Sequence, residues 1–241
     1  MNKDNQGGLF FLGLFVAIGL GFAGHFIGQT LYNAKVALNT AEVKGLAERR
    51  VRADRVNWTV SHRVSGKSRE EIPALYQQAE KHQQAIIDLL KSNNFEDSEI
   101  QVGVFNYQYL EYRDENQRLV DESHILAGSI SVESNKIEQI SEVRGKVNKL
   151  IAEGIDIDNG TPAYRFTGLN QIKPEMLSEA TKNARIAANE FAKNAGVKVG
   201  GIRSATQGSF FIRDAGEEYG DTTKIDKDVR VVTTITFYLT D

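Results

Sequence analysis

The sequence contains no cysteine, few prolines and no excess of basic residues, and each absence excludes a class of protein. Without cysteine, the chain can form no disulfide, thiolate nucleophile, Cys-ligated zinc site or iron–sulfur cluster. Three prolines in 241 residues are too few for a proline-rich linker protein. Lys and Arg number 29 against 32 Asp and Glu, a net charge of −3, so we expect no nucleic-acid partner.

The remaining composition is that of an ordinary folded protein. Apolar residues make up 41% of the chain and charged residues 25%, which is close to typical globular usage. A chain of 241 residues holds one large domain or two small ones, and either can bury a core.

A long apolar segment lies near the N-terminus. From Leu9 to Ile27 every residue is apolar or glycine except His25, and a helix needs about 20 such residues to cross a bilayer. The alternative is a signal peptide cleaved after about Ala23, but the apolar run continues past that position. We therefore predict a short tail over residues 1–8, a membrane anchor over 9–28, a linker over 29–40 and a folded domain over 41–241.

Small residues recur along this segment at helical spacing. Such a stripe lets two helices approach closely in lipid. The predicted self-association face consists of Gly13, Ala17, Gly21, Gly24 and Gly28. Residues 19–24 also match the dinucleotide fingerprint GxGxxG, but that motif needs a preceding strand and a βαβ unit, so we expect no nucleotide cofactor.

Hydrophobic periodicity divides the rest of the chain into strands and helices. Strands arrive in pairs separated by single helices, which favours an α+β fold with three main helices on one face of an antiparallel or mixed sheet, preceded by one N-terminal transmembrane helix. The predicted elements are a strand over 55–64, a helix over 72–90 after a Ser68–Glu71 capping box, a bulged strand over 100–109, a strand over 126–132, a helix over 137–151, a strand over 163–166, a helix with Pro174 in its first turn, and strands over 202–212 and 229–239.

The third of these helices has an alanine-rich apolar face, which predicts close packing on a sheet. The residues of that face are Leu177, Ala180, Ala184, Ala187, Ala188, Phe191 and Ala195.

Four arginines soon after the predicted anchor form the sharpest basic cluster. They are candidates for contact with an anionic lipid or polysaccharide surface. The alternative, which we favour, is a solvated strand edge whose arginines pair with Glu42, Glu48 or Asp54. The cluster comprises Arg49, Arg50, Arg52 and Arg55.

No pattern typical of a metal or catalytic site is found. His62 and His82 share faces with apolar neighbours and are interpreted as packing residues, and neither they nor His124 belong to an HExxH motif. One acidic loop superficially suggests a calcium site, but its spacing fails the EF-hand pattern, so a solvated hairpin connection is preferred. That loop contains Asp214, Gly216, Glu218, Gly220 and Asp221.

Short motifs over about residues 41–241 occur in a characteristic order. They are Val43-Lys44-Gly45, Asp54, Ser98-Glu99-Ile100-Gln101, Gly128, a helix with Ala184, Ala187, Ala188 and Ala192, then Gly196, Gly200-Gly201-Ile202 and a long closing strand. In this order they resemble the SIMPL-domain family of bacterial envelope proteins. The resemblance implies an exported α+β domain with an N-terminal signal or anchor and no established catalytic residue. It favours a body outside the cytoplasm, whereas the basic residues after the helix favour the opposite orientation.

These observations predict a non-enzymatic protein of the inner membrane with its body in the periplasm, or a periplasmic protein if the segment is cleaved. We expect it to act by self-assembly, as a homo-oligomer, or by binding another envelope protein or an anionic lipid or polysaccharide, with no cofactor. The alternative is an envelope hydrolase or other enzyme whose site is assembled from dispersed residues.

Overall fold

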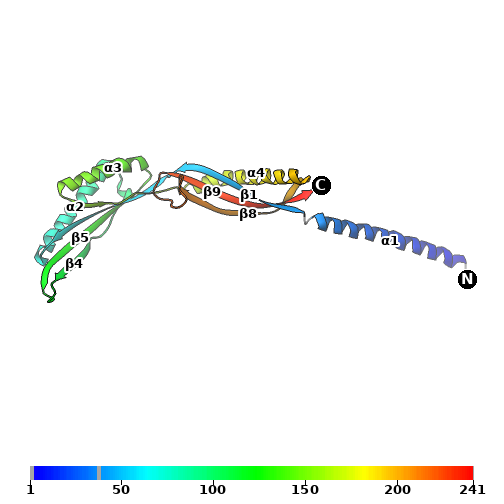
Figure 1. The fold of residues 1–241 in the computed structure, drawn as a ribbon, viewed down its shortest axis with the longest axis horizontal. Coiled ribbons are helices and arrows are strands. Elements are labelled where there is room, and N and C mark those ends of the chain that lie inside the picture. Colours follow the sequence, from blue (N-terminus) through cyan, green and yellow to red (C-terminus); the bar gives the residue numbers. More distant parts are fainter. Residues whose placement is uncertain (1–2, 37–38, 241) are drawn as a thin grey trace. The chain divides into compact units, whose positions relative to one another are not determined.

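A computed structural model describes residues 3–36 and 39–240. Within these ranges the chain forms four α-helices and nine strands, and the strands make two antiparallel sheets, which confirms the predicted α+β class (Figure 1). The chain divides into two compact units. The first comprises residues 1–47, 174–210 and 230–241, and the second comprises residues 48–173 and 211–229.

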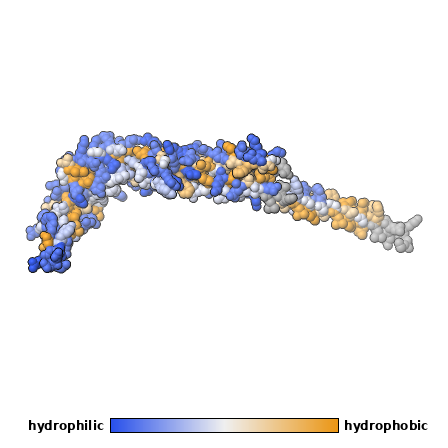
Figure 2. All heavy atoms as spheres, viewed as in Figure 1, coloured by the Kyte–Doolittle hydropathy of each residue, from blue (hydrophilic) through white to orange (hydrophobic). Residues whose placement is uncertain are grey.

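The first helix, α1 (Lys3–Val36), contains the predicted apolar segment. Over Phe10–Tyr32 it is long and apolar enough to cross a membrane, which fits either an anchor or a signal sequence. Apolar side chains cover this part of α1 in Figure 2. The helix runs through Val36, so residues 29–36 of the expected linker are helical. Residues 1–2 of the expected tail and 37–38 of the linker lie outside the described residues.

A three-stranded sheet with the order β1-β9-β8 forms the centre of the first unit and continues into the second. Its strands are β1 (Thr40–Arg52), β8 (Lys198–Asp214) and β9 (Asp226–Thr240). The amide of Leu239 donates to the carbonyl of Asn39, and the amide of Ala53 donates to that of Ile225. Residue numbers therefore rise on β1 as they fall on β9, which makes this pair antiparallel.

Helix α4 (Leu169–Ala195) packs on this sheet through residues spaced four apart. Ala184 and Ala188 pack with Val43, Ile235 and Phe237 in one buried cluster. The buried row on α4 is Met176, Ala180, Ala184, Ala188 and Ala192. Small side chains let the helix approach closely, because a Cβ built on Gly45 of β1 would lie 1.9 Å from the carbonyl oxygen of Ala180.

Two predictions about α4 are wrong. The helix begins at Leu169, so Pro174 lies inside it rather than in its first turn. Phe191 is 64% exposed instead of joining the packed face, and Ala195, also predicted to lie on that face, is exposed as well. The face is a row of residues four apart, and Phe191 lies outside this row while Ala192 lies in it.

The second unit contains a six-stranded antiparallel sheet built around two long strands, β2 (Arg55–Gly66) and β5 (Leu119–Ser134). The order β3-β5-β2-β6 is completed by β4 beside β5 and β7 beside β2. The shorter strands are β3 (Ile100–Val102), β4 (Asn106–Arg113), β6 (Asp156–Asn159) and β7 (Ala163–Arg165). The strand predicted over 100–109 is thus two strands, because the change of parity is a break at residues 103–105 rather than a bulge.

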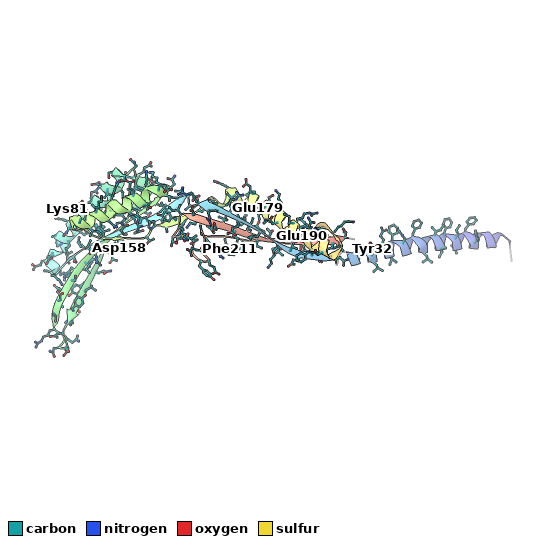
Figure 3. The ribbon with its side chains drawn as sticks, turned by 45° about the horizontal axis from the view of Figure 1, so that its top comes forward. Tyr32, Lys81, Asp158, Glu179, Glu190 and Phe211 are labelled. Carbon is teal, nitrogen blue, oxygen red and sulfur yellow. The ribbon has the colours of Figure 1, made fainter. Side chains whose placement is uncertain are left out.

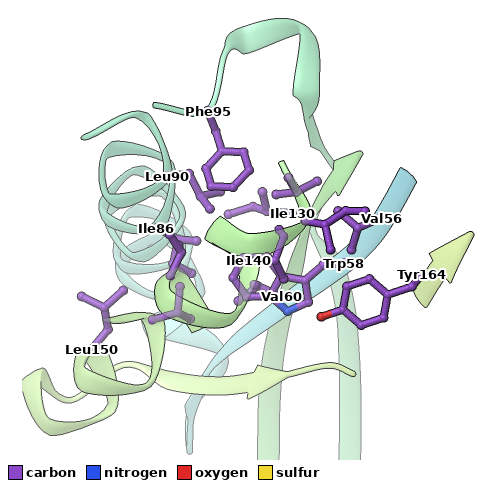
Figure 4. Packing of buried hydrophobic residues seen from close by; sticks show 14 of the residues in the cluster. Val56, Trp58, Val60, Ile86, Leu90, Phe95, Ile130, Ile140, Leu150 and Tyr164 are labelled. Carbon is purple, nitrogen blue, oxygen red and sulfur yellow. The ribbon is translucent and has the colours of Figure 1, made fainter. Parts of the chain in front are cut away.

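Helices α2 (Ile72–Ser92) and α3 (Ile137–Lys149) cover one face of this sheet. Trp58 of β2 is buried in one large cluster that also contains Ile86 and Leu90 of α2 and Ile140 of α3 (Figure 4). Its indole nitrogen donates to Asn159 Oδ1 at 3.0 Å, so the only polar atom of the ring is satisfied. This cluster is the core of the second unit.

Three short 3-10 helices flank the α-helices, namely Arg69–Glu71, Asp97–Glu99 and Leu150–Glu153. Ser68 caps the first of them by accepting a hydrogen bond from the amide of Glu70 at 3.2 Å. Gly154 ends the last with a φ of 90°, a left-handed conformation that glycine adopts without steric cost.

Candidate functional site

The small-residue face predicted on α1 is open in this structure. A Cβ built on Gly13, Gly21, Gly24 or Gly28 would meet no atom within 4 Å, and Ala17 is exposed. The stripe is therefore available for a second helix, and its role in association stays a prediction.

The arginine cluster has different partners from those expected. The Arg50 guanidinium donates two hydrogen bonds, of 2.9 and 3.2 Å, to the carboxylate of Asp228 on β9. Arg52 donates to Glu138 of α3 at 2.5 Å. These carboxylates come from distant parts of the sequence, so Glu42, Glu48 and Asp54 were the wrong choice for these two arginines. The Asp54 carboxylate instead accepts a hydrogen bond from the amide of Thr167 at 2.8 Å.

Pairing neutralises part of the charge of this cluster. The hydrogen bond and charge of Asp228 raise the pKa of Arg50, and the same hydrogen bond lowers the pKa of Asp228. Arg55, at the start of β2, lines a separate pocket with Glu96, Glu99 and Lys136. The four arginines therefore do not form one unpaired basic surface.

The acidic loop between β8 and β9 surrounds the buried ammonium group of a lysine side chain, Lys227. The ammonium group of Lys227 donates to the Asp214 carboxylate and, at 2.8 Å, to the carbonyl oxygen of Asp221. Thr223 donates to the same carboxylate through its hydroxyl, at 2.5 Å, and through its amide, at 2.9 Å. The loop is thus closed by an internal ion pair, as a structural connection rather than a calcium site.

Two histidines meet in the interior of the second unit. The rings of His62 on β2 and His82 on α2 lie 6.4 Å apart, and neither ring nitrogen of buried His62 has a hydrogen-bond partner. Burial, with a smaller contribution from the charge of His82, lowers the pKa of His62, and burial lowers that of His82. His62 is buried and His82 is half-buried, in keeping with their interpretation as packing residues. In the described part of the chain no three His, Cys, Asp or Glu side chains are placed to hold a metal ion.

A third histidine belongs to an aromatic group on the β4–β5 hairpin. Tyr107 and Tyr109 share one face of β4, and Tyr109 pairs with His124 of β5. The His124 ring lies 6.0 Å from that of Tyr107 and 5.0 Å from that of Tyr109, at angles of 21° and 33°. The Tyr107 hydroxyl and His124 Nδ1 are 2.7 Å apart, and the Tyr109 hydroxyl donates to Glu122 at 3.1 Å.

These side chains line a pocket of about 530 Å³ that is completed by Arg69, in the 3-10 helix before α2, and by Ile72, the first residue of α2. The pocket combines an aromatic wall with one cationic and one anionic side chain, a lining typical of small-molecule sites. We call it the hairpin pocket; its residues are Arg69, Ile72, Tyr107, Tyr109, Glu122 and His124. For this region the sequence predicted only a bulged strand over residues 100–109. It could not show that Arg69 and Glu122 lie beside the tyrosines.

Strand β8 presents a second exposed surface, in the first unit. It ends the strand order β1-β9-β8, and every residue from Gly201 to Gln207 is exposed whichever face it occupies. Apolar side chains are among them, since Ile202 is 49% exposed. Phe211 stands out from the same strand further along and is 53% exposed (Figure 3).

Comparison with known protein families gives a match. Residues 41–237 match the SIMPL family, which is described as a protein of unknown function (DUF541). The chain belongs to the SIMPL family. The match covers both units but begins after α1, in agreement with the resemblance found in the sequence. No curated protein matches the chain significantly.

Proposed function

We propose that this SIMPL protein is a non-enzymatic component of the cell envelope that is anchored by α1 and acts by self-assembly of its sheet domain. The anchor would lie in the inner membrane and the body in the periplasm. The exposed apolar length of α1 supports the membrane anchor. The periplasmic location of the body rests on the resemblance of the sequence to envelope proteins. The exposed edge of strand β8 is the feature that supports self-assembly.

An edge strand offers unpaired amide and carbonyl groups to any strand that can lie beside it. Proteins usually protect such edges with short strands, bulges, charges or a covering element. Strand β8 is 17 residues long, and within the described residues its outer edge has no partner strand. Arg203 is the one charged side chain between Gly201 and Gln207. This stretch therefore suits pairing with a second copy of the chain.

Light scattering on the full chain in detergent, corrected for bound detergent, tests this proposal. We expect a protein mass well above the 26.8 kDa of one chain, rising with concentration. Ile202→Lys places a charge on the exposed edge strand and should lower the mass. Val104→Lys is the matched control, because Val104 is 91% exposed in the second unit, and it should leave the mass unchanged. A strictly monomeric mass at high concentration would refute assembly.

The anchor is tested separately. A full-length chain with a C-terminal tag should stay in the membrane fraction at its full size, whereas a chain that begins at Ala34 should not enter that fraction. A shortened soluble product from the full-length gene would instead show that the segment is removed near Ala23.

A further inference from the structure

The hairpin pocket holds charged and polar groups that the protein itself leaves incompletely satisfied. Among the described residues, no carboxylate lies within ion-pair distance of Arg69. His124 is 3% exposed, yet its Nε2 has no hydrogen-bond partner in the described part of the chain and lies 3.7 Å from Glu122 Oε1, beyond hydrogen-bond range. A buried polar atom without a partner is costly in a folded protein, so this nitrogen is available for a hydrogen bond with a ligand or with water.

The inner part of the pocket suits an organic cation. Tyrosine rings attract ammonium groups through their π faces, and an adjacent carboxylate adds a full negative charge. Tyr107, Tyr109 and Glu122 supply these features side by side on the two strands of the hairpin. The side chain of Glu122 is only 29% exposed, so its charge is less screened than that of a fully solvated carboxylate.

The side of the pocket contributed by the 3-10 helix Arg69–Glu71 suits an anion. The guanidinium of Arg69 offers several donors in a planar fork that matches the oxygens of a phosphate. Ile72, one turn further along the chain, adds an apolar surface. A ligand that satisfies both sides must carry a positive and a negative group, joined by a short apolar link.

We propose that the hairpin pocket binds a phosphate ester of an amino alcohol, with its ammonium group against Tyr107, Tyr109 and Glu122 and its phosphate on Arg69. Phosphocholine and phosphoethanolamine are of this class, either free or as lipid headgroups. Such an ester would be the envelope component that this domain binds. This proposal rests on the proposed location of the body in the periplasm but not on the proposed self-assembly.

Calorimetric titration of the full chain with phosphocholine, in a maltoside detergent that contains no such headgroup, tests the proposal. Choline alone and inorganic phosphate alone should each bind about tenfold more weakly or worse, because each loses one charge-assisted contact. Dihexanoylphosphatidylcholine below its micelle concentration separates the two sources. Tighter binding than phosphocholine would assign a lipid, and equal binding would assign the free ester.

Variants at the two sides of the pocket separate the two charges. Arg69→Met should reduce phosphocholine affinity to that of choline and leave choline binding unchanged, whereas Glu122→Gln should weaken both. Arg118→Met, in the turn of the same hairpin, is the control and should bind as the wild type does. Circular dichroism would check that each variant is folded. Ile202→Lys should keep full affinity even if assembly is lost, so the two proposals can fail separately.

Three results would overturn the proposal. The first is the absence of saturable phosphocholine binding to the folded wild type. The second is equal affinity for choline or for phosphate alone, which would show that the pocket recognises one charge rather than two. The third is an Arg69→Met variant that binds phosphocholine as tightly as the wild type.

Discussion

Lys227 and Asp214 form an ion pair in which both side chains are almost wholly buried, at 0% and 1% exposure. Burial alone would raise the pKa of the Asp214 carboxyl, but the hydrogen bonds from Lys227 and Thr223 outweigh it and hold this pKa well below its usual range. The pair joins the last residue of β8 to the second residue of β9, and so closes the loop between them. We therefore expect the ion pair to stabilise the end of the sheet where β8 ends and β9 begins.

Replacing Lys227 with methionine should destabilise the second unit by roughly 3–5 kcal/mol, because it leaves a buried carboxylate without its counter-charge. Urea unfolding followed by the fluorescence of Trp58, the single tryptophan of the chain, reports on this unit. Lys224→Met is the control, since Lys224 pairs with Glu217 on the surface and both side chains are about half exposed. An equal loss in the two variants would contradict a special role for the buried pair.

The interior histidines should make the protein sensitive to mild acid. The pKa of His62 is lowered in the folded state, so the unfolded chain binds protons more readily below the ordinary histidine pKa of about 6.5. Stability should therefore fall as the pH drops through about 6.5 and continue to fall until the folded pKa is reached.

The variant His62→Leu removes this titration and should flatten the dependence of the unfolding free energy on pH. Urea unfolding at several pH values between neutrality and mild acid measures the slope. His25→Leu, in α1, is the matched control and should keep the wild-type slope. An unchanged slope in His62→Leu would show that another group is responsible.

Gly45 should tolerate no larger residue, because its position on β1 faces the backbone of α4. A Cβ there would lie 1.9 Å from Ala180 O and 2.7 Å from the amide nitrogen of Ala184, so the helix must move. Overpacking of this kind typically costs about 1–3 kcal/mol, and we expect Gly45→Ala to lower the thermal midpoint by several degrees.

The control for this variant is Gly145→Ala. Gly145 lies inside α3, and an added Cβ there would meet no atom within 4 Å. Alanine is a better helix former than glycine by about 0.8–1 kcal/mol, so this substitution should raise the midpoint. Circular dichroism melts of the two variants should move in opposite directions, and a shift of the same sign in both would contradict the packing argument.

The arginine cluster should bind anionic membranes only weakly, because Arg50 and Arg52 are engaged by carboxylates of the same unit. Cosedimentation of residues 41–241 with anionic vesicles should change little when all four arginines are replaced by glutamine. The variant Glu138→Gln with Asp226→Asn and Asp228→Asn should bind more strongly and in a salt-dependent way, because it removes the ion-pair partners of both guanidinium groups. A large loss of binding in the quadruple variant would restore the cluster as a surface site.

Much of the fold could be predicted because its information is local. The apolar length of residues 9–28 indicated a membrane helix, and alternation over 55–64 located β2. Helical spacing located α2 and α3, and Gly154 ended the 3-10 helix that follows α3. In each case the side-chain period of a helix or strand shows directly which residues must face a core.

Errors arose where two helical faces competed or where a strand was short. The predicted face of α4 included Phe191, although the row of residues four apart that contacts the sheet excludes it. Strand β6, of four residues, was missed because its pairing with β2 supplies the order that its sequence does not specify.

By itself the sequence determined the apolar helix and the α+β class, because composition and periodicity are properties of neighbouring residues. The order of its short motifs carried the resemblance to the family. Only the tertiary structure decided which charges meet. Arg50 finds Asp228 from 178 positions away, and Arg69 comes to line one pocket with Glu122. Such pairs depend on strand register and on where a helix begins, and a shift of one residue turns a side chain to the opposite face of its strand. The hairpin pocket therefore exists only in the folded chain.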